Sequence, residues 1–285
     1  MELLYRSFVN ATSQLNADSD LIKQAFINFY GDHNKSYIEE KLSNLRIVWY
    51  EDKEIDEVDD IKNHIVSSIP AEEMKELLSK RSKSAFLKSA YIDELDLLVL
   101  PLSYDLTHII HEFNHRVSSH ILSYKPLILT DGISYIQERN VGLMIYDEFL
   151  NEAINQNMTL DILDELNNLG IKTKVTSSWQ EHLFPLVNLF YDTFKDLLKE
   201  TFISGDLSGF VSLVGEDNYN DFSQIIYLKG NKIRRQLRNG NIPEISQESI
   251  DVAEDIVHKM QLHYEAMNNN ERKKISKDQN SSILF

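Results

Sequence analysis

The chain has 285 residues, a formal net charge of −16 and no cysteine. The absence of cysteine excludes disulfide scaffolds, thiolate-ligated zinc fingers, iron–sulfur centres and a cysteine nucleophile, so any metal site must use histidine, carboxylate or carbonyl ligands. The acidic excess argues against general binding of nucleic acid, which requires Lys and Arg to neutralise phosphates.

The first 94 residues are expected to form an N-terminal portion that mixes helix and strand. Apolar residues at helical spacing predict a helix over residues 21–30, and Gly31 is suited to end it. The β-branched and aromatic residues of 45–50 predict a strand.

An acidic run follows at residues 51–60. It lacks the spaced oxygen ligands and central glycine of a calcium-binding loop, so we interpret it as a solvated loop that leads into a helix. Helices are predicted over residues 57–69 and 71–80, on either side of Pro70.

Residues 95–175 are expected to form a core segment that begins with a strand over 95–100. A helix is predicted over 104–118, with Ser103 as its N-cap. This helix contains the most informative motif of the chain, which is described below.

A β-hairpin is predicted over residues 126–136, because Asp131-Gly132 is a favoured two-residue turn between two apolar runs. Two helices are predicted next, over 141–155 and 160–169, and Gly170 is suited to end the second.

Residues 176–267 are expected to form a helical C-terminal subdomain. Helical spacing of apolar residues predicts helices over 181–202, 221–237 and 246–267. Residues 268–285 are polar and without periodicity over most of their length, so we interpret them as a flexible tail.

The segment 111–115 has the sequence His-Glu-Phe-Asn-His, an H-E-x-x-H motif. The i, i+4 spacing places His111 and His115 on one face of the helix, one turn apart. Two imidazole nitrogens in this arrangement can bind one Zn²⁺, and Glu112 then lies beside the metal without ligating it. In metallopeptidases this glutamate accepts a proton from the attacking water and passes it to the leaving amine. The motif therefore predicts one zinc ion per chain.

A zinc site needs a third protein ligand, and the helix after the predicted hairpin contains the segment Leu150-Asn151-Glu152-Ala153-Ile154. Together with the H-E-x-x-H motif, this segment resembles the zincin metallopeptidases, and among them the gluzincin branch. The resemblance covers residues 95–155. It implies a zincin-like fold with His111, His115 and Glu152 as zinc ligands and Glu112 as general base.

Two positions depart from the family pattern. Arg116 follows the second histidine, where an uncharged residue is preferred, and Gln156 occupies the place of an aspartate that orients a ligand histidine. A ligand histidine normally donates its second ring N–H to a carboxylate or carbonyl. Asp131 and Asp147 are the two carboxylates of the sequence that are candidates for accepting this N–H.

Several further residues are candidates for the site. Glu148 lies one turn before the predicted third ligand and is its rival, or an outer partner. His108 lies one turn before the first ligand histidine, where a second metal, a proton relay or an ordinary polar position are the alternatives. A peptidase also stabilises an oxyanion, and Tyr135 and His182 are candidate donors.

The sequence as a whole predicts an α+β protein with a zincin-like fold. A small mixed sheet, built from 45–50, 95–100 and the 126–136 hairpin, is expected beside the motif helix, and the C-terminal half is expected to be mostly helical. The predicted function is zinc-dependent hydrolysis of peptide bonds in a peptide or protein substrate. The alternatives are an inactive binding protein with a zincin fold, and a helical interaction protein in which the motif is accidental.

The N-terminal sequence has no secretory signal pattern, and no apolar stretch approaches the roughly 18 residues of a membrane-spanning helix. The expected location is therefore the cytoplasm by default, with export by a route that needs no signal peptide left open.

Overall fold

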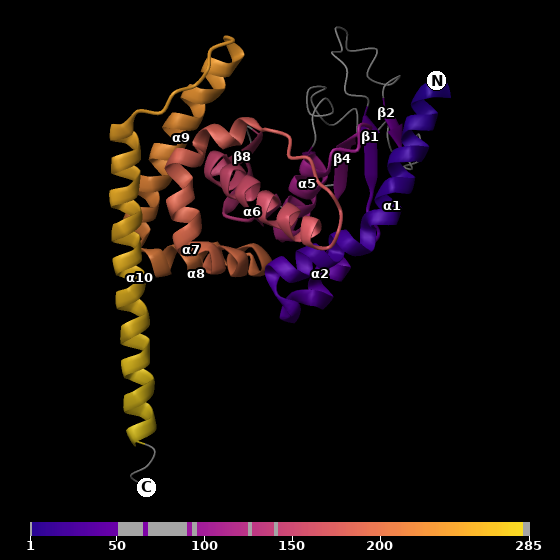
Figure 1. Cartoon of the computed structure of the whole chain (residues 1–285). Coiled ribbons are helices and arrows are strands. Elements are labelled where there is room, and N and C mark those ends of the chain that lie inside the picture. Colours follow the sequence, from indigo (N-terminus) through magenta and orange to yellow (C-terminus); the bar gives the residue numbers. More distant parts are fainter. Residues whose placement is uncertain are drawn as a thin grey trace. The chain divides into compact units, whose positions relative to one another are not determined.

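The structure is a computed structural model that describes residues 2–50, 65–67, 90–92, 96–124, 127–139 and 142–281 (Figure 1). The described chain is a mixture of helices and small sheets in which helix predominates, as the sequence predicted at this level. The acidic run 51–60 and the predicted helix 71–80 lie outside the described residues. None of the described helices combines the length and the apolar character that a membrane crossing requires.

The chain divides into two compact units, each built from two separate stretches. The first unit comprises Met1–Ser119 and Asn155–Ser177, and the second comprises His120–Ile154 and Ser178–Phe285. The division falls within one continuous helix, α6 (Glu148–Asn168), so this helix contributes its first turns to the second unit and the remainder to the first.

The first unit contains a four-stranded sheet in the order β2-β1-β4-β3. Strands β1 and β4 are parallel, whereas β2 and β3 run antiparallel to their neighbours, so the sheet is mixed. All residues of β1 and β4 are buried, which agrees with their continuous apolar sequences. The strands are β1 (Ile47–Tyr50), β2 (Ile65–Ser67), β3 (Ala90–Ile92) and β4 (Leu97–Pro101).

The helices of the first unit begin with α1 (Glu2–Tyr30), which starts much earlier than the predicted 21–30. Its apolar face is long and interrupted, because Ala11, Leu15 and Ile22 are buried between polar residues. A 3₁₀ turn, η1 (Asp32–Asn34), and helix α2 (Lys35–Lys41) follow. The prediction of a helix over 57–69 is wrong in part, because Ile65–Ser67 forms strand β2.

Helix α5 (Leu106–Ser118) contains the H-E-x-x-H motif and packs against β3 and β4. The mixed sheet beside the motif helix is therefore confirmed. The predicted N-cap, Ser103, is wrong, because Tyr104 adopts a left-handed φ of 53° and the chain enters the helix only afterwards. Asp105 is the N-cap, and its carboxylate accepts a hydrogen bond of 2.9 Å from the backbone N–H of Thr107.

The second unit contains a separate four-stranded sheet in the order β5-β6-β7-β8. The predicted hairpin lies here, in β6 (Leu127–Asp131) and β7 (Ser134–Arg139), so its assignment to the same sheet as 45–50 and 95–100 is wrong. The remaining strands are β5 (Ser119–Tyr124) and β8 (Gly142–Tyr146).

The hairpin turn is shifted by one residue from the prediction. Asp131 pairs with Ser134, so the two central residues are Gly132 and Ile133. Gly132 has a φ of 57°, the positive value that a type II′ turn requires at its first central position. Asn151 fixes the turn, because its side-chain oxygen accepts a 3.0 Å hydrogen bond from the backbone N–H of Ile133.

The prediction of two separate helices, over 141–155 and 160–169, is wrong about where the helical structure begins and about the break between the helices. Residues 142–146 form strand β8, and α6 then runs without interruption to Asn168. Asp147 separates the two elements with a φ of 61°. Short apolar runs such as 143–146 suit either a strand or a helix, and pairing with β7 decides between them here.

The C-terminal half is helical, as predicted. The 3₁₀ turn η5 (Trp179–Leu183) leads into α7 (Phe184–Ser204), α8 (Leu207–Val214), α9 (Glu216–Arg238) and α10 (Gln247–Ser281). Helix α10 packs along α7, α8 and α9 (Figure 1). The expected helix end at Met267 is wrong, because α10 continues to Ser281.

Candidate metal centre

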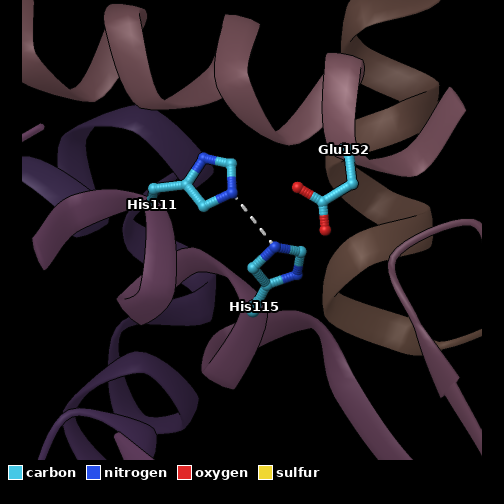
Figure 2. Close-up of side chains that lie close together, drawn as sticks. All are labelled: His111, His115 and Glu152. Atoms are coloured by element: carbon cyan, nitrogen blue, oxygen red, sulfur yellow. Dashed lines mark hydrogen bonds between the residues drawn. The ribbon is translucent and has the colours of Figure 1, made fainter. Parts of the chain in front are cut away.

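The two motif histidines lie side by side on helix α5. His111 and His115 are both buried, with 7% of each residue exposed. Their Nε2 atoms are 3.2 Å apart, and Figure 2 shows the hydrogen bond between the two rings, with the carboxylate of Glu152 beside them. Two nitrogens that bind one tetrahedral Zn²⁺ at about 2.0–2.1 Å are expected to lie about 3.3 Å apart. The histidine pair therefore has the separation that a shared zinc ion requires.

Glu152 reaches the histidine pair from the second turn of α6 (Figure 2). One nitrogen from each histidine and one carboxylate oxygen of Glu152 all lie within 4.8 Å of one another. Among the residues that the structure describes, this is the group of histidine and acidic side chains that converges in this way. The convergence expected from the two sequence segments is thus confirmed.

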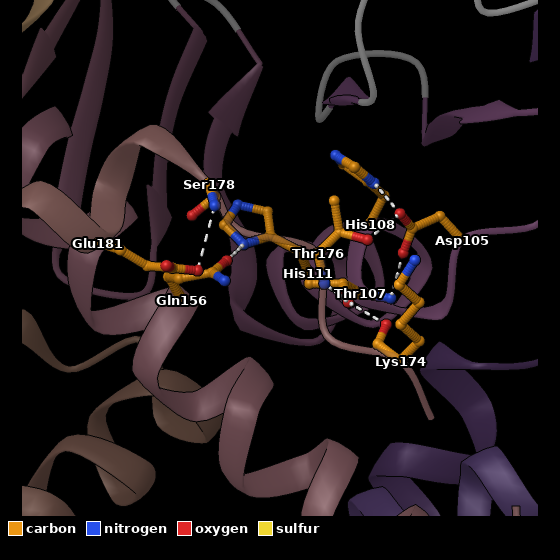
Figure 3. A network of polar contacts seen from close by, with 9 residues as sticks. All are labelled: Asp105, Thr107, His108, His111, Gln156, Lys174, Thr176, Ser178 and Glu181. Carbon is orange, nitrogen blue, oxygen red and sulfur yellow. Dashed lines mark hydrogen bonds and ion pairs between the residues drawn. The ribbon is translucent and has the colours of Figure 1, made fainter. Parts of the chain in front are cut away.

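Gln156 is the partner of the first histidine. Its side-chain oxygen lies 3.0 Å from His111 Nδ1, and the glutamine is only 1% exposed (Figure 3). A carboxamide oxygen is an acceptor, so this contact places a proton on Nδ1 and leaves the lone pair of Nε2 for a cation. Gln156 therefore makes the contact with a motif histidine that the resemblance assigns to an aspartate.

The two aspartates considered for this task are engaged in the second unit instead. Asp131 accepts a hydrogen bond from Asn151. Asp147 accepts hydrogen bonds from Tyr219 and Ser223 on α9, and its burial raises its pKa.

Gln180 is the partner of the carboxylate. Its side-chain nitrogen donates a 2.9 Å hydrogen bond to Glu152 Oε2, and the residue is 8% exposed. Gln180 lies on η5, which begins with a capping box formed by Ser178 and Glu181 (Figure 3). Sequence reasoning missed this residue, because 28 positions separate it from Glu152 and no local pattern relates the two.

A buried polar network fixes helix α5 against α6 within the first unit. Asn155 donates a 3.1 Å hydrogen bond to the backbone carbonyl of His111, and its side-chain oxygen accepts from Asn114. Asn114 in turn accepts from the hydroxyl of Tyr30 on α1. Asn114 and Asn155 are fully buried, so their polar atoms depend on these contacts. The network sets the register of the motif helix relative to α6.

Arg116, the charged residue after the second histidine, is directed to different partners. Its guanidinium forms a bidentate pair with Asp96, at 2.7 and 2.9 Å, and also donates to the backbone carbonyls of Lys41 and Ser43. The hydrogen bonds from Arg116 hold the pKa of Asp96 below its ordinary value. All three nitrogens of the Arg116 guanidinium donate to protein oxygens, which explains why a charge is tolerated at this position of the motif.

The other candidate ligands have partners of their own. His108 Nδ1 lies 3.1 Å from the carboxylate of Asp105, the N-cap of α5, and Thr176 donates to the same carboxylate (Figure 3). Glu148, the rival third ligand, forms a 2.6 Å ion pair with Arg234 on α9. Neither His108 nor Glu148 belongs to the converging group.

The predicted catalytic residues are placed as follows. Glu112 is on α5 and is buried, with 5% of the residue exposed. Tyr135, an oxyanion candidate, is half-buried on β7 and contacts the ring of Tyr146 across the ladder. The second oxyanion candidate, His182, is half-buried on η5, two residues after Gln180.

The three converging side chains could hold a metal ion. Two imidazole nitrogens and one carboxylate oxygen are the protein ligands of catalytic zinc sites that keep a fourth position open. His111 is held in the tautomer that presents Nε2, and the hydrogen bond from Gln180 to Oε2 leaves the second oxygen of Glu152 to face a cation.

Comparison of the chain with protein-family models, with curated proteins and with solved structures gave no match.

Proposed function

We propose that the chain is a zinc-dependent hydrolase that cleaves peptide bonds in a peptide or protein substrate. The observation that supports this most directly is the convergence of His111, His115 and Glu152. An accidental H-E-x-x-H sequence on a helix gives no reason for a carboxylate 37 residues further along the chain to lie within 4.8 Å of both histidines. The convergence therefore supports a metal centre over an accidental motif.

His111, His115 and Glu152 would hold one zinc ion. When bound, the ion supplies Lewis acidity, which lowers the pKa of a coordinated water and polarises a carbonyl group. The three protein ligands leave a fourth position for water or substrate, whereas structural zinc sites are closed by four protein ligands. This ligand count favours a catalytic role.

Glu112 is the general base in this proposal. It follows His111 directly, so it begins on the same helical turn as the ligands without taking part in the converging group. Its carboxylate accepts a proton from the attacking water and transfers it to the leaving amine. Peptides are the proposed substrates because the segments 111–115 and 150–154 together resemble the gluzincin peptidases, and the mixed sheet beside α5 supports a zincin-like fold.

The metal is tested by elemental analysis of the purified wild-type protein and the His115→Ala variant. We expect about one zinc per wild-type chain and almost none in the variant, because one of three protein ligands is lost. Equal and near-zero zinc in both proteins would contradict the proposal.

Catalysis is tested by the Glu112→Gln variant, assayed against a broad library of peptides. We expect it to retain zinc and to lose hydrolysis by roughly 10²–10⁴-fold, the range that general base catalysis contributes. A wild-type protein that binds zinc and cleaves no peptide would instead favour a metal-binding module without catalysis.

A further inference from the structure

Two glutamine side chains hold two of the converging residues, and they do so independently. Gln156 lies on α6 and contacts His111, whereas Gln180 lies on η5 and contacts Glu152. Both glutamines are more than nine-tenths buried, so water does not compete freely for these hydrogen bonds. Each amide is therefore held next to the side chain that it contacts.

The chemical consequence follows from the fact that an amide carries no charge. A carboxylate that accepts the Nδ1–H of a ligand histidine raises the basicity of the ring, and it adds a negative charge near the cation. A carboxamide oxygen fixes the same tautomer as a neutral and weaker acceptor. Gln156 therefore orients His111 without making it a stronger donor.

The role of Gln180 follows from the direction of its hydrogen bond. Its nitrogen donates to Glu152 Oε2, which occupies one carboxylate oxygen and leaves the other to face a cation. The oxygen of Gln180 is buried and has no hydrogen-bond partner among the described residues. The amide is thus held by its donor end alone, and its contact with Glu152 decides its orientation.

We propose that Gln156 and Gln180 are positioning residues that orient His111 and Glu152 with uncharged amides. With an amide at position 156, the centre binds zinc less tightly, and the bound zinc is more electrophilic, than with a carboxylate at that position. This inference rests on the proposed metal centre and adds to it. It predicts that two substitutions at the same buried position have opposite effects on zinc affinity.

The experiment measures the affinity of each purified protein for Zn²⁺ alone, by competition with a chromophoric chelator at fixed pH. The variants are Gln156→Glu, Gln156→Met and Gln180→Met. Matched controls are Gln224→Glu and Gln224→Met, because Gln224 is an exposed residue of α9. Circular dichroism of the metal-free proteins shows whether each variant is folded.

We expect Gln156→Met and Gln180→Met to bind Zn²⁺ about 10- to 100-fold more weakly than the wild type, the usual cost of losing an outer partner of a ligand. We expect Gln156→Glu to bind about 10-fold more tightly, because it restores a charged acceptor for His111. The two Gln224 variants should match the wild type. The visible absorption bands of Co²⁺-loaded protein should shift in Gln156→Glu and stay unchanged in Gln224→Glu, since only the former changes the donor strength of a ligand.

The outcomes separate this inference from the metal centre itself. Wild-type protein that binds no Zn²⁺ overturns both proposals. Wild-type protein that binds Zn²⁺, together with unchanged affinity in folded Gln156→Met and Gln180→Met, overturns the role of the glutamines and leaves the metal centre standing. Weaker binding in Gln156→Glu than in Gln156→Met also overturns it. If the buried carboxylate prevents folding of Gln156→Glu, the two methionine variants decide the question.

Discussion

On helix α5, His115 and Arg116 are neighbours in sequence, yet their side chains meet opposite chemical surroundings. The guanidinium of Arg116 is matched by the carboxylate of Asp96 and by two backbone carbonyls. The Nε2 of His115 faces another imidazole nitrogen at 3.2 Å and the carboxylate of Glu152. The cluster around Arg116 pairs one cation with oxygen acceptors, whereas the cluster around His115 brings two imidazoles and a carboxylate together without a cationic side chain.

This difference separates a structural cluster from a candidate site. Buried polar groups are normally satisfied by protein partners, and the Arg116 cluster satisfies its charge locally. Two imidazoles and a carboxylate that converge can exchange the proton they share for a metal cation, which all three side chains can ligate. The comparison therefore predicts that a perturbation of the histidine cluster changes metal binding, while a perturbation of the arginine cluster changes stability.

The largest effect is expected for Glu152→Gln, with Glu148→Gln as its matched control. The glutamine at 152 keeps an oxygen that accepts from Gln180 and removes only the charged ligand. We expect zinc affinity to fall by more than the roughly 100-fold that marks the upper cost of an outer partner. Glu148→Gln breaks the ion pair with Arg234 and should leave zinc affinity unchanged within about two-fold.

Chelator competition measures both variants. A large loss of zinc affinity in Glu148→Gln, with normal affinity in Glu152→Gln, would make Glu148 the third ligand. Equal affinity in all three proteins would remove both glutamates from the site and break the comparison between the two clusters.

The part of the site that the sequence could predict is the part that local periodicity encodes. The i, i+4 spacing of His111 and His115 places them on one helical face whatever the rest of the fold does. Glu152 was predicted from the identity of its neighbours in segment 150–154, which is a pattern and not a physical derivation. Its approach to the histidines depends on the packing of α6 against α5, which the Asn114 and Asn155 contacts stabilise.

The contacts that the sequence could not predict are those made across long separations. Gln180 meets Glu152 through the position of η5, and nothing in residues 178–183 indicates this. Gln156 was recognised as a departure from a family pattern, but only the structure shows that its oxygen reaches His111 Nδ1. From side-chain chemistry alone, an amide at position 156 could either make the contact with His111 that a carboxylate would make or leave that contact unmade.

The incorrect predictions about the fold also have physical causes. Strand β8 was assigned to a helix, because a short apolar run carries no decisive period and its partner strand is known only from the structure. The hairpin was placed in the wrong sheet, since pairing between distant strands is a tertiary property. Ser103 fits the N-cap position in sequence because Ser is a common cap, but the positive φ of Tyr104 moves the start of the helix beyond it.

A smaller effect is expected for Arg116→Met, which tests the other side of the comparison. We expect the free energy of unfolding of the metal-free protein to fall by about 2 kcal/mol, because hydrogen bonds to a charged group are lost. This value allows for the half-exposed side chain of Asp96, which regains water. Urea unfolding measures the change, and Arg235→Met, at an exposed position of α9, is the control.

Zinc affinity of the folded Arg116→Met protein should equal that of the wild type. A loss of zinc affinity of ten-fold or more, with unchanged stability, would show that Arg116 acts on the site despite its contacts with Asp96. The division between a structural and a metal-binding side of α5 would then be wrong.

The smallest effect is expected at the start of α5, where Asp105 joins the helix to His108 and Thr176. Burial alone would raise the pKa of Asp105, but hydrogen bonds from His108, Thr176 and the backbone of Thr107 outweigh it and lower the pKa to about 2. A carboxyl group with a lowered pKa stabilises the fold above its unfolded pKa of 3.8, and this contribution is lost as the pH falls from about 4 through the folded pKa of about 2. Asn at position 105 still caps the helix but has no charge to lose. We therefore expect Asp105→Asn to be less stable than the wild type by about 1 kcal/mol at pH 6, and the difference to shrink steadily as the pH falls from about 4 to about 2. Thermal unfolding across this pH range measures it.

A difference that is constant with pH would mean that the charge of Asp105 is irrelevant to the N-terminus of α5. A loss of zinc affinity in Asp105→Asn at pH 7 would instead join His108 to the metal-binding side of the helix.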